Sequence, residues 1–199
     1  DLPVNNLKEF IAYAKKNPGK VSYASSGTGS SDHLSAELFK LQTGTFGVHV
    51  PYRGGAAAMS DLMGGNVDTS FQNLGAAIGH IRSGRLKALG VTSTERVRRE
   101  LIDAGLMHAD VATVSEQGLP GFVVTSWQAF MGPRGLPRDV LARLNAELVN
   151  ALNAPDVRER FAQMAFDVVA NKPEEFADFQ RKEIARWRDV VKQKGLALE

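Results

Sequence analysis

The residues most suited to binding a ligand form a short loop of small side chains. Residues 21–24 are typical of a buried strand, and the sequence Ser-Ser-Gly-Thr-Gly-Ser-Ser at 25–31 follows it and opens a helical stretch. Glycines let the backbone turn and approach a ligand, while hydroxyls and the free N–H groups of a helix start donate hydrogen bonds. The loop is therefore a candidate anion site, with an ordinary turn capped by Ser30 or Ser31 as the alternative.

The loop does not match the known nucleotide-binding patterns. No Gly-Lys-Ser/Thr follows it, and the third glycine of a dinucleotide fingerprint is missing. A small anion, such as a carboxylate, is the better expectation.

Composition restricts the class of protein. The 199 residues are 43% hydrophobic, which is enough for one full domain or two small ones. The net charge of +2 is too small to indicate nucleic acid as a partner, and acids flank the basic run at 96–99. There is no cysteine, so disulfides and thiolate metal sites are excluded. We expect neither a metal nor a cofactor, because no histidines are paired at ligand spacing; these are His33, His49, His80 and His108.

Strand-like and helical stretches alternate along the first half of the chain. Apolar segments at 47–51, 67–71 and 86–92 predict strands, and 7–16, 56–63 and 76–83 predict helices. Such alternation is typical of an α/β fold with a mostly parallel sheet flanked by helices, in which ligands bind outside the carboxyl ends of the strands. The loops at 25–31, 52–55 and 72–75 all fall on that edge.

The second half is mainly helical. A strand-like run at 122–131 contains Trp127, and predicted helices follow at 138–153, 155–164 and 173–194. The last helix has an acidic first turn after Pro173 and one apolar seam that we expect to be core. The seam consists of Phe176, Ile184, Trp187 and Val191.

Six motifs in succession make the sequence similar to one receptor family. They stand at residues 23–34, 49–54, 61–68, 85–92, 116–121 and 173–176. Together they resemble the substrate-binding receptors of tripartite tricarboxylate transporters, of the TctC or Bug type. The resemblance implies a periplasmic-binding-protein type II fold with two lobes. Residues 1–124 would form most of the second lobe and 125–199 the returning segment of the first, whose remainder would precede Asp1 in a longer precursor.

The resemblance also implies where the ligand binds. The loop would hold a carboxylate through N–H and O–H donors, and Asn73 would add a side-chain contact. Arg53 would pair with a second carboxylate, or else be an exposed turn residue, and His33 would bond within its own lobe. The loop positions that match the family are Ser25, Ser26, Gly27, Gly29 and Ser30.

The implied function is that of a periplasmic receptor, not an enzyme, that captures a small carboxylate for the membrane components of the transporter. Two other classes stay open. One is a hydrolase using Ser30 or Ser31 with His33 and an acid such as Asp68. The other is a stand-alone sensor domain for a small anion.

An incomplete first lobe would leave apolar side chains uncovered. The seam of the last helix, with Trp127 and Phe130, would then form an open patch. Such patches rarely stay exposed in monomers. We therefore expect them to be covered by another copy of the chain in a homo-oligomer, by strand or helix exchange, or by rearranged terminal helices.

Overall fold

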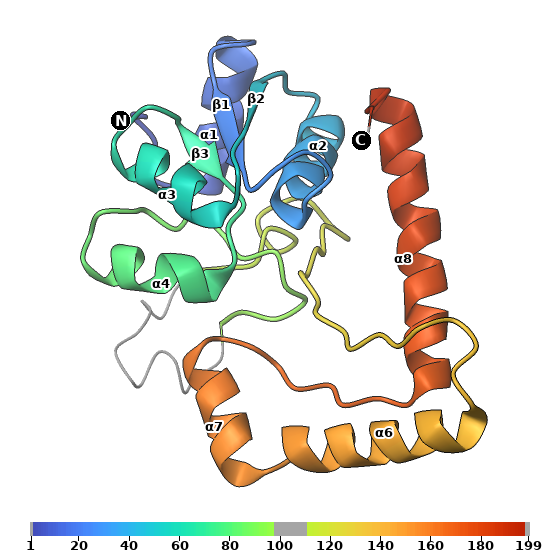
Figure 1. Ribbon diagram of the computed structural model, residues 1–199. Coiled ribbons are helices and arrows are strands. Elements are labelled where there is room, and N and C mark those ends of the chain that lie inside the picture. Colours follow the sequence, from blue (N-terminus) through green and yellow to red (C-terminus); the bar gives the residue numbers. More distant parts are fainter. Residues whose placement is uncertain (1, 98–110, 198–199) are drawn as a thin grey trace. The chain divides into compact units, whose positions relative to one another are not determined.

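The computed structural model describes residues 2–97 and 111–197, which form two compact units (Figure 1). The first unit comprises the chain up to Ser126 together with the stretch from Val190 onward, and the second is Trp127–Asp189. The lobe boundary between residues 124 and 125 stays a prediction.

The first unit is built on a three-stranded parallel sheet, as the alternating pattern predicts. Strands β1 (Ser22–Ser25), β2 (Val48–Pro51) and β3 (Thr69–Ser70) stand in the order β2-β1-β3. In the central strand Ala24 pairs with Val50 on one side and Ser70 on the other. The helices of this unit are α1 (Leu7–Lys16), α2 (Ser31–Thr43), α3 (Gly55–Met63) and α4 (Leu74–Arg82).

An aromatic cluster fills the core of the first unit. Phe39 of α2 is fully buried and contacts the rings of Phe10, Phe71 and Phe122, with centroids 5.6 to 6.2 Å apart. Such ring pairs add to the burial of apolar area. The cluster joins α1, α2, the end of β3 and a segment distant in sequence, so it fixes α2 against the sheet.

A reciprocal polar contact locks the start of the sheet. The Asp68 carboxylate accepts hydrogen bonds from the Ser22 N–H, at 2.8 Å, and the Ser22 hydroxyl, at 2.7 Å. The Asp68 N–H donates in return to the Ser22 hydroxyl at 2.9 Å. Asp68 therefore holds the approach to β3 against β1 and lies at the amino end of the strands, away from the loop at 25–31.

Two predicted strands are wrong. Residues 86–92 form only an isolated bridge, Val91 with Thr113, and residues 122–131 form no strand. The two stretches meet at one point, where the Val124 N–H donates to the Thr92 carbonyl at 2.8 Å. An extended segment counts as a strand only when a neighbour continues its ladder, and among the described residues these two find too few partners.

The second unit is helical. It contains α6 (Arg138–Leu152), α7 (Pro155–Gln163) and most of α8 (Pro173–Lys194). Trp127 packs edge-on against Phe176 and Phe179, at 5.5 and 5.7 Å between centroids. The seam predicted as core is only partly buried, since Ile184 is 50% exposed.

Candidate functional site

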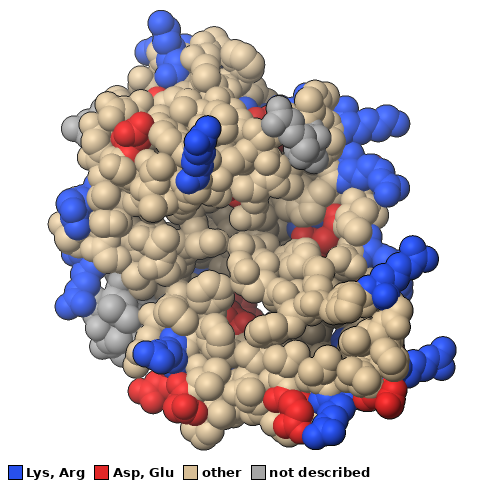
Figure 2. Space-filling model, viewed as in Figure 1, with Lys and Arg blue, Asp and Glu red and all other residues tan. Residues whose placement is uncertain are grey.

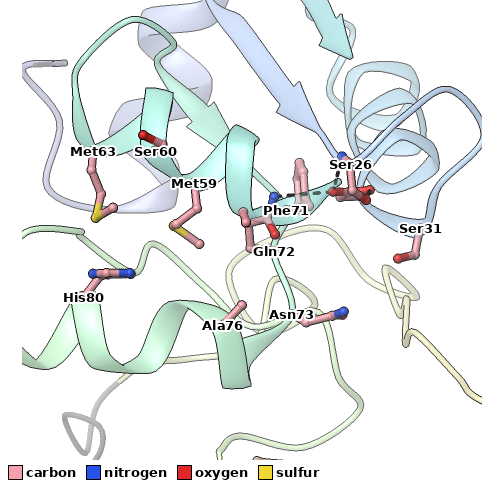
Figure 3. A pocket seen from close by; sticks show the side chains of 13 residues that line it. Ser26, Ser31, Met59, Ser60, Met63, Phe71, Gln72, Asn73, Ala76 and His80 are labelled. Carbon is pink, nitrogen blue, oxygen red and sulfur yellow. Dashed lines mark hydrogen bonds between the residues drawn. The ribbon is translucent and has the colours of Figure 1, made fainter. Parts of the chain in front are cut away.

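A pocket of ≈ 450 Å³ lies where three loops leave the carboxyl ends of the strands (Figure 3). All of its walls belong to the first unit. One end is polar, and the other is lined mainly by the apolar side chains of α3 and α4. The polar side chains at the first end are those of Ser26, Ser31, Asp32, Gln72 and Asn73.

The loop between β1 and α2 has the tight backbone expected of it. Gly27 has a φ of 140° and Gly29 a φ of 79°, and residues other than glycine rarely adopt these angles. The loop uses several of its own donors. The Gly27 N–H donates to the Ser25 hydroxyl at 3.2 Å, and the Gly29 N–H donates to His33 Nδ1 at 3.0 Å. The hydroxyl of Ser30 caps α2.

A carboxylate of the protein itself occupies part of this loop. The Ser26 N–H and hydroxyl both donate to Asp32, at 2.7 and 2.9 Å, and Gln72 Nε2 approaches the same carboxylate at 3.4 Å. Asp32 is 5% exposed. The positive end of α2 is thus already partly compensated by an internal anion. The sequence alone did not indicate this contact.

The starts of α3 and α4 have no side-chain caps, although the Ala76 N–H in the first turn of α4 donates to the Asn73 carbonyl at 3.0 Å. Neither Gly54 nor Asn73, the residues that precede these helices, caps its helix with a side chain. The first N–H groups of a helix have no partner inside it. Gly55 and Ala56 of α3 and Asn73 before α4 all line the pocket. The pocket therefore faces two uncapped helix starts, where an anion is favoured.

The predicted site residues occupy different places. Ser26 and Asn73 line the pocket. Ser25 is fully buried and shares a 2.6 Å hydrogen bond with His49 Nε2. Arg53 is exposed and is not among the lining residues. The remaining loop residues, Gly27, Gly29 and Ser30, shape the turn.

A stacked pair of histidines is hydrogen-bonded to the loop between β1 and α2. The rings of His33 and His49 lie 3.7 Å apart and nearly parallel. Burial, and after it the neighbouring His33, lower the pKa of His49 to about 4. Burial also lowers the pKa of His33. Both rings are therefore neutral at neutral pH.

Acid should therefore weaken the fold through His49. Its pKa is about 4 in the folded chain and 6.5 in an unperturbed histidine, so the unfolded chain binds the proton first as the pH falls. Stability is lost as the pH drops from about 6.5 to about 4, by on the order of 2 kcal/mol. Urea unfolding at about pH 7 and about pH 4.5 measures this loss.

The matched variant for that experiment is His49→Gln. It should be less stable than the parent near neutral pH, because the bond to Ser25 changes, yet lose less stability on acidification. An equal loss in both proteins would show that His49 does not carry the effect.

The catalytic pair considered from the sequence is not assembled. His33 Nδ1 accepts the Gly29 N–H, the Ser30 hydroxyl donates to the Gly27 carbonyl, and Asp68 is bonded to Ser22. The serine that does contact a histidine, Ser25, is fully buried. A nucleophile must reach its substrate, so the geometry does not favour hydrolysis.

His80 lines the pocket, a role that the sequence did not predict for it. Its Nδ1 is shielded from solvent without a partner among the described residues. The available signal was helical spacing, because Asn73, Ala76 and His80 are three and seven positions apart and share one face of α4. His108 lies outside the described residues.

The described residues hold neither a metal-binding cluster nor a membrane-spanning helix. Across residues 2–97 and 111–197, no group of three or more His, Asp or Glu side chains is placed to hold a metal ion. No helix in the same ranges is long and apolar enough to cross a bilayer. Lys, Arg, Asp and Glu side chains are scattered over the face drawn in Figure 2, much of which is uncharged.

Solved structures of similar proteins share this fold. R. palustris Rpa4515 with adipate matches with a TM-score of 0.86 and 32% identity, over 99% of this chain and 63% of that one. The periplasmic binding protein BugD matches with 0.82 and 33%, over 100% and 64%. MatC from Rhodopseudomonas palustris with bound malate matches with 0.79 and 31%, over 95% and 63%. The periplasmic-binding-protein α/β fold is thereby confirmed over the shared part.

Sequence comparison agrees. BugT of Bordetella pertussis is 36% identical over 198 residues, and the chain spans 58% of its length. The family described as "Tripartite tricarboxylate transporter family receptor" matches residues 1–196. The chain therefore belongs to the tripartite tricarboxylate transporter receptor family, the TctC or Bug type.

Proposed function

We propose that the protein is a periplasmic receptor that captures a small carboxylate and delivers it to the membrane components of a tripartite tricarboxylate transporter. The observation that carries this proposal is the pocket with two uncapped helix starts and an open amide side chain. Family membership supports the same class of function. Two relatives hold carboxylic acids, adipate in Rpa4515 and malate in MatC.

The donors of the pocket suit a carboxylate that is bound without a charged partner. No Lys or Arg lines the pocket within the described residues. N–H groups at helix starts stabilise anions through hydrogen bonds and the helix dipole. Asn73 offers a further amide donor, and Ser31 offers a hydroxyl.

We assign the predicted residues two kinds of role. Asn73 contacts the carboxylate, and Ser26, whose two donors bind Asp32, contacts only its hydration. Ser25, Gly27, Gly29 and Ser30 hold the loop in shape. Arg53 is proposed as a charge partner for a second carboxylate in acids whose second carboxylate lies at the rim of the pocket. This last role depends on a movement of its exposed side chain.

The exposed apolar side chains of the second unit suggest a further contact. Phe130 is 73% exposed and Val169 is 75% exposed. We propose that these side chains are covered in the working receptor, with a second copy of the chain as one partner of suitable chemistry. Neither nucleic acid nor a cofactor is part of the proposal.

A carboxylate placed at the start of α3 should block binding. Ala56 is exposed, lines the pocket and stands in the first turn. In Ala56→Asp the new charge repels the ligand and competes for the same N–H groups. The affinity for carboxylates should fall by about 30-fold or more. Isothermal titration calorimetry of the purified protein with a panel of organic acids measures this change.

The matched control is Ala57→Asp. It adds the same charge in the same turn at an exposed position that does not line the pocket. Both variants should keep or slightly raise the stability of α3, by about 0.3–1 kcal/mol. Equal binding in the parent and Ala56→Asp, or an equal loss in both variants, would place the carboxylate elsewhere.

A further inference from the structure

We propose that His80 is a specificity-determining residue, which recognises a second polar group at the far end of a linear acid. This inference rests on the proposed function, because the first carboxylate must be held at the helix starts. Three observations support it: the position of His80 along α4, the apolar middle of the pocket and the hydrogen bonding of the imidazole.

The position of His80 sets the length of the pocket. Asn73, Ala76 and His80 all line it and share one face of α4. With a rise of 1.5 Å per residue, Asn73 and His80 are about 10 Å apart along the helix axis. Figure 3 shows His80 beside Met63, at the other end of the pocket from Ser31.

Apart from the exposed Ser60, the walls between these two ends are apolar. Met59 and Met63 project from α3, and Ala76 faces them from α4 (Figure 3). Methionine side chains adapt to an apolar chain of irregular shape. The middle of the pocket therefore suits methylene groups, and a polar group there would lose its hydration without compensation.

Only one nitrogen of the His80 imidazole, Nε2, is available to bond a ligand. Nδ1 is shielded from solvent and has no hydrogen-bond partner within the described residues. Orphaned buried N–H groups are rarer than under-satisfied acceptors, which favours Nδ1 as an acceptor and Nε2 as the nitrogen that carries the proton. Nε2–H can then donate into the pocket, and a carboxylate is the strongest acceptor that it could meet.

The two ends together select a ligand length. A hydrogen bond of about 2.8 Å at each end leaves roughly 5 Å of the pocket for the acid itself. Linear dicarboxylates of about four carbons, whose outermost oxygen atoms lie roughly 5–6 Å apart, fit this span. The distal group is recognised by His80 and the methylene chain by Met59 and Met63.

The test compares two acids of equal chain length, succinate and butyrate, by titration calorimetry of the purified protein. The parent should prefer succinate by about tenfold or more. His80→Leu should remove most of this preference by weakening succinate binding about tenfold, with butyrate affinity unchanged within about twofold. His80→Gln, which keeps a donor, should retain part of the preference.

Arg82→Ala is the control, because Arg82 is exposed on the same helix and does not line the pocket. It should bind both acids as the parent does. A preference that survives in His80→Leu, or is absent from the parent, would overturn the role of His80. The proposed function would still stand if Ala56→Asp removed the binding of both acids. If the parent binds neither acid but binds another carboxylate of the panel, the role of His80 fails and the proposed function stands; if it binds no carboxylate at all, the proposed function fails.

Discussion

Phe39→Ala should lower the free energy of unfolding by about 4 kcal/mol. The ring is fully buried and contacts three other aromatic rings from different parts of the chain. Removing it leaves a cavity that these rings cannot fill without leaving their own contacts. Equilibrium unfolding in urea measures the change as a lower midpoint.

The control for this variant is Phe46→Ala, at a ring that is 66% exposed. It should cost less than about 1 kcal/mol. Similar losses in the two variants would mean that the aromatic cluster is not the centre of the fold.

Gly47→Ala should lower the free energy of unfolding by about 3 kcal/mol. A Cβ atom at this position would overlap the ring of Tyr23 and lie 2.7 Å from the Val21 carbonyl oxygen. The carbonyl belongs to the backbone next to the central strand, so relief requires a shift of the sheet. Thermal or urea unfolding, followed by circular dichroism, detects this loss.

Gly79→Ala is the opposite case on the same fold. Gly79 lies inside α4, and a Cβ atom there would meet nothing within 4 Å. Alanine should stabilise the helix by about 0.5–1 kcal/mol. If Gly47→Ala stabilised the protein as Gly79→Ala is expected to do, the backbone around Gly47 would not be as tightly packed as described.

Local signals predicted most of the helices. The bounds of α1 and α8 follow from the sequence, because Asn6 caps the first through the Glu9 N–H and Pro173 opens the second. The strands next to the loops were also predicted within one or two residues, except at 86–92 and 122–131. Those stretches have apolar sequences, but a strand depends on partners that the local sequence does not specify.

The candidate site was predictable only in part. The glycines of the loop between β1 and α2 signalled a tight turn, and both have the positive φ that this turn needs. The contact between Ser26 and Asp32 was not predictable, because a first-turn carboxylate can turn either way. The contribution of α3, through Ala56 and Met59, depends on how the helices pack on the sheet. Such packing is set by tertiary structure and not by spacing.

The central claim is that a carboxylate binds between the starts of α3 and α4, and a crystal structure of the protein grown with its tightest-binding acid tests this most directly. We predict electron density for the carboxylate within hydrogen-bond distance of the N–H groups at Gly55 and Ala56 or the Asn73 side chain. Its chain should extend along Met59 toward His80. Density for the acid outside this pocket, with the pocket itself free of it, would contradict the account.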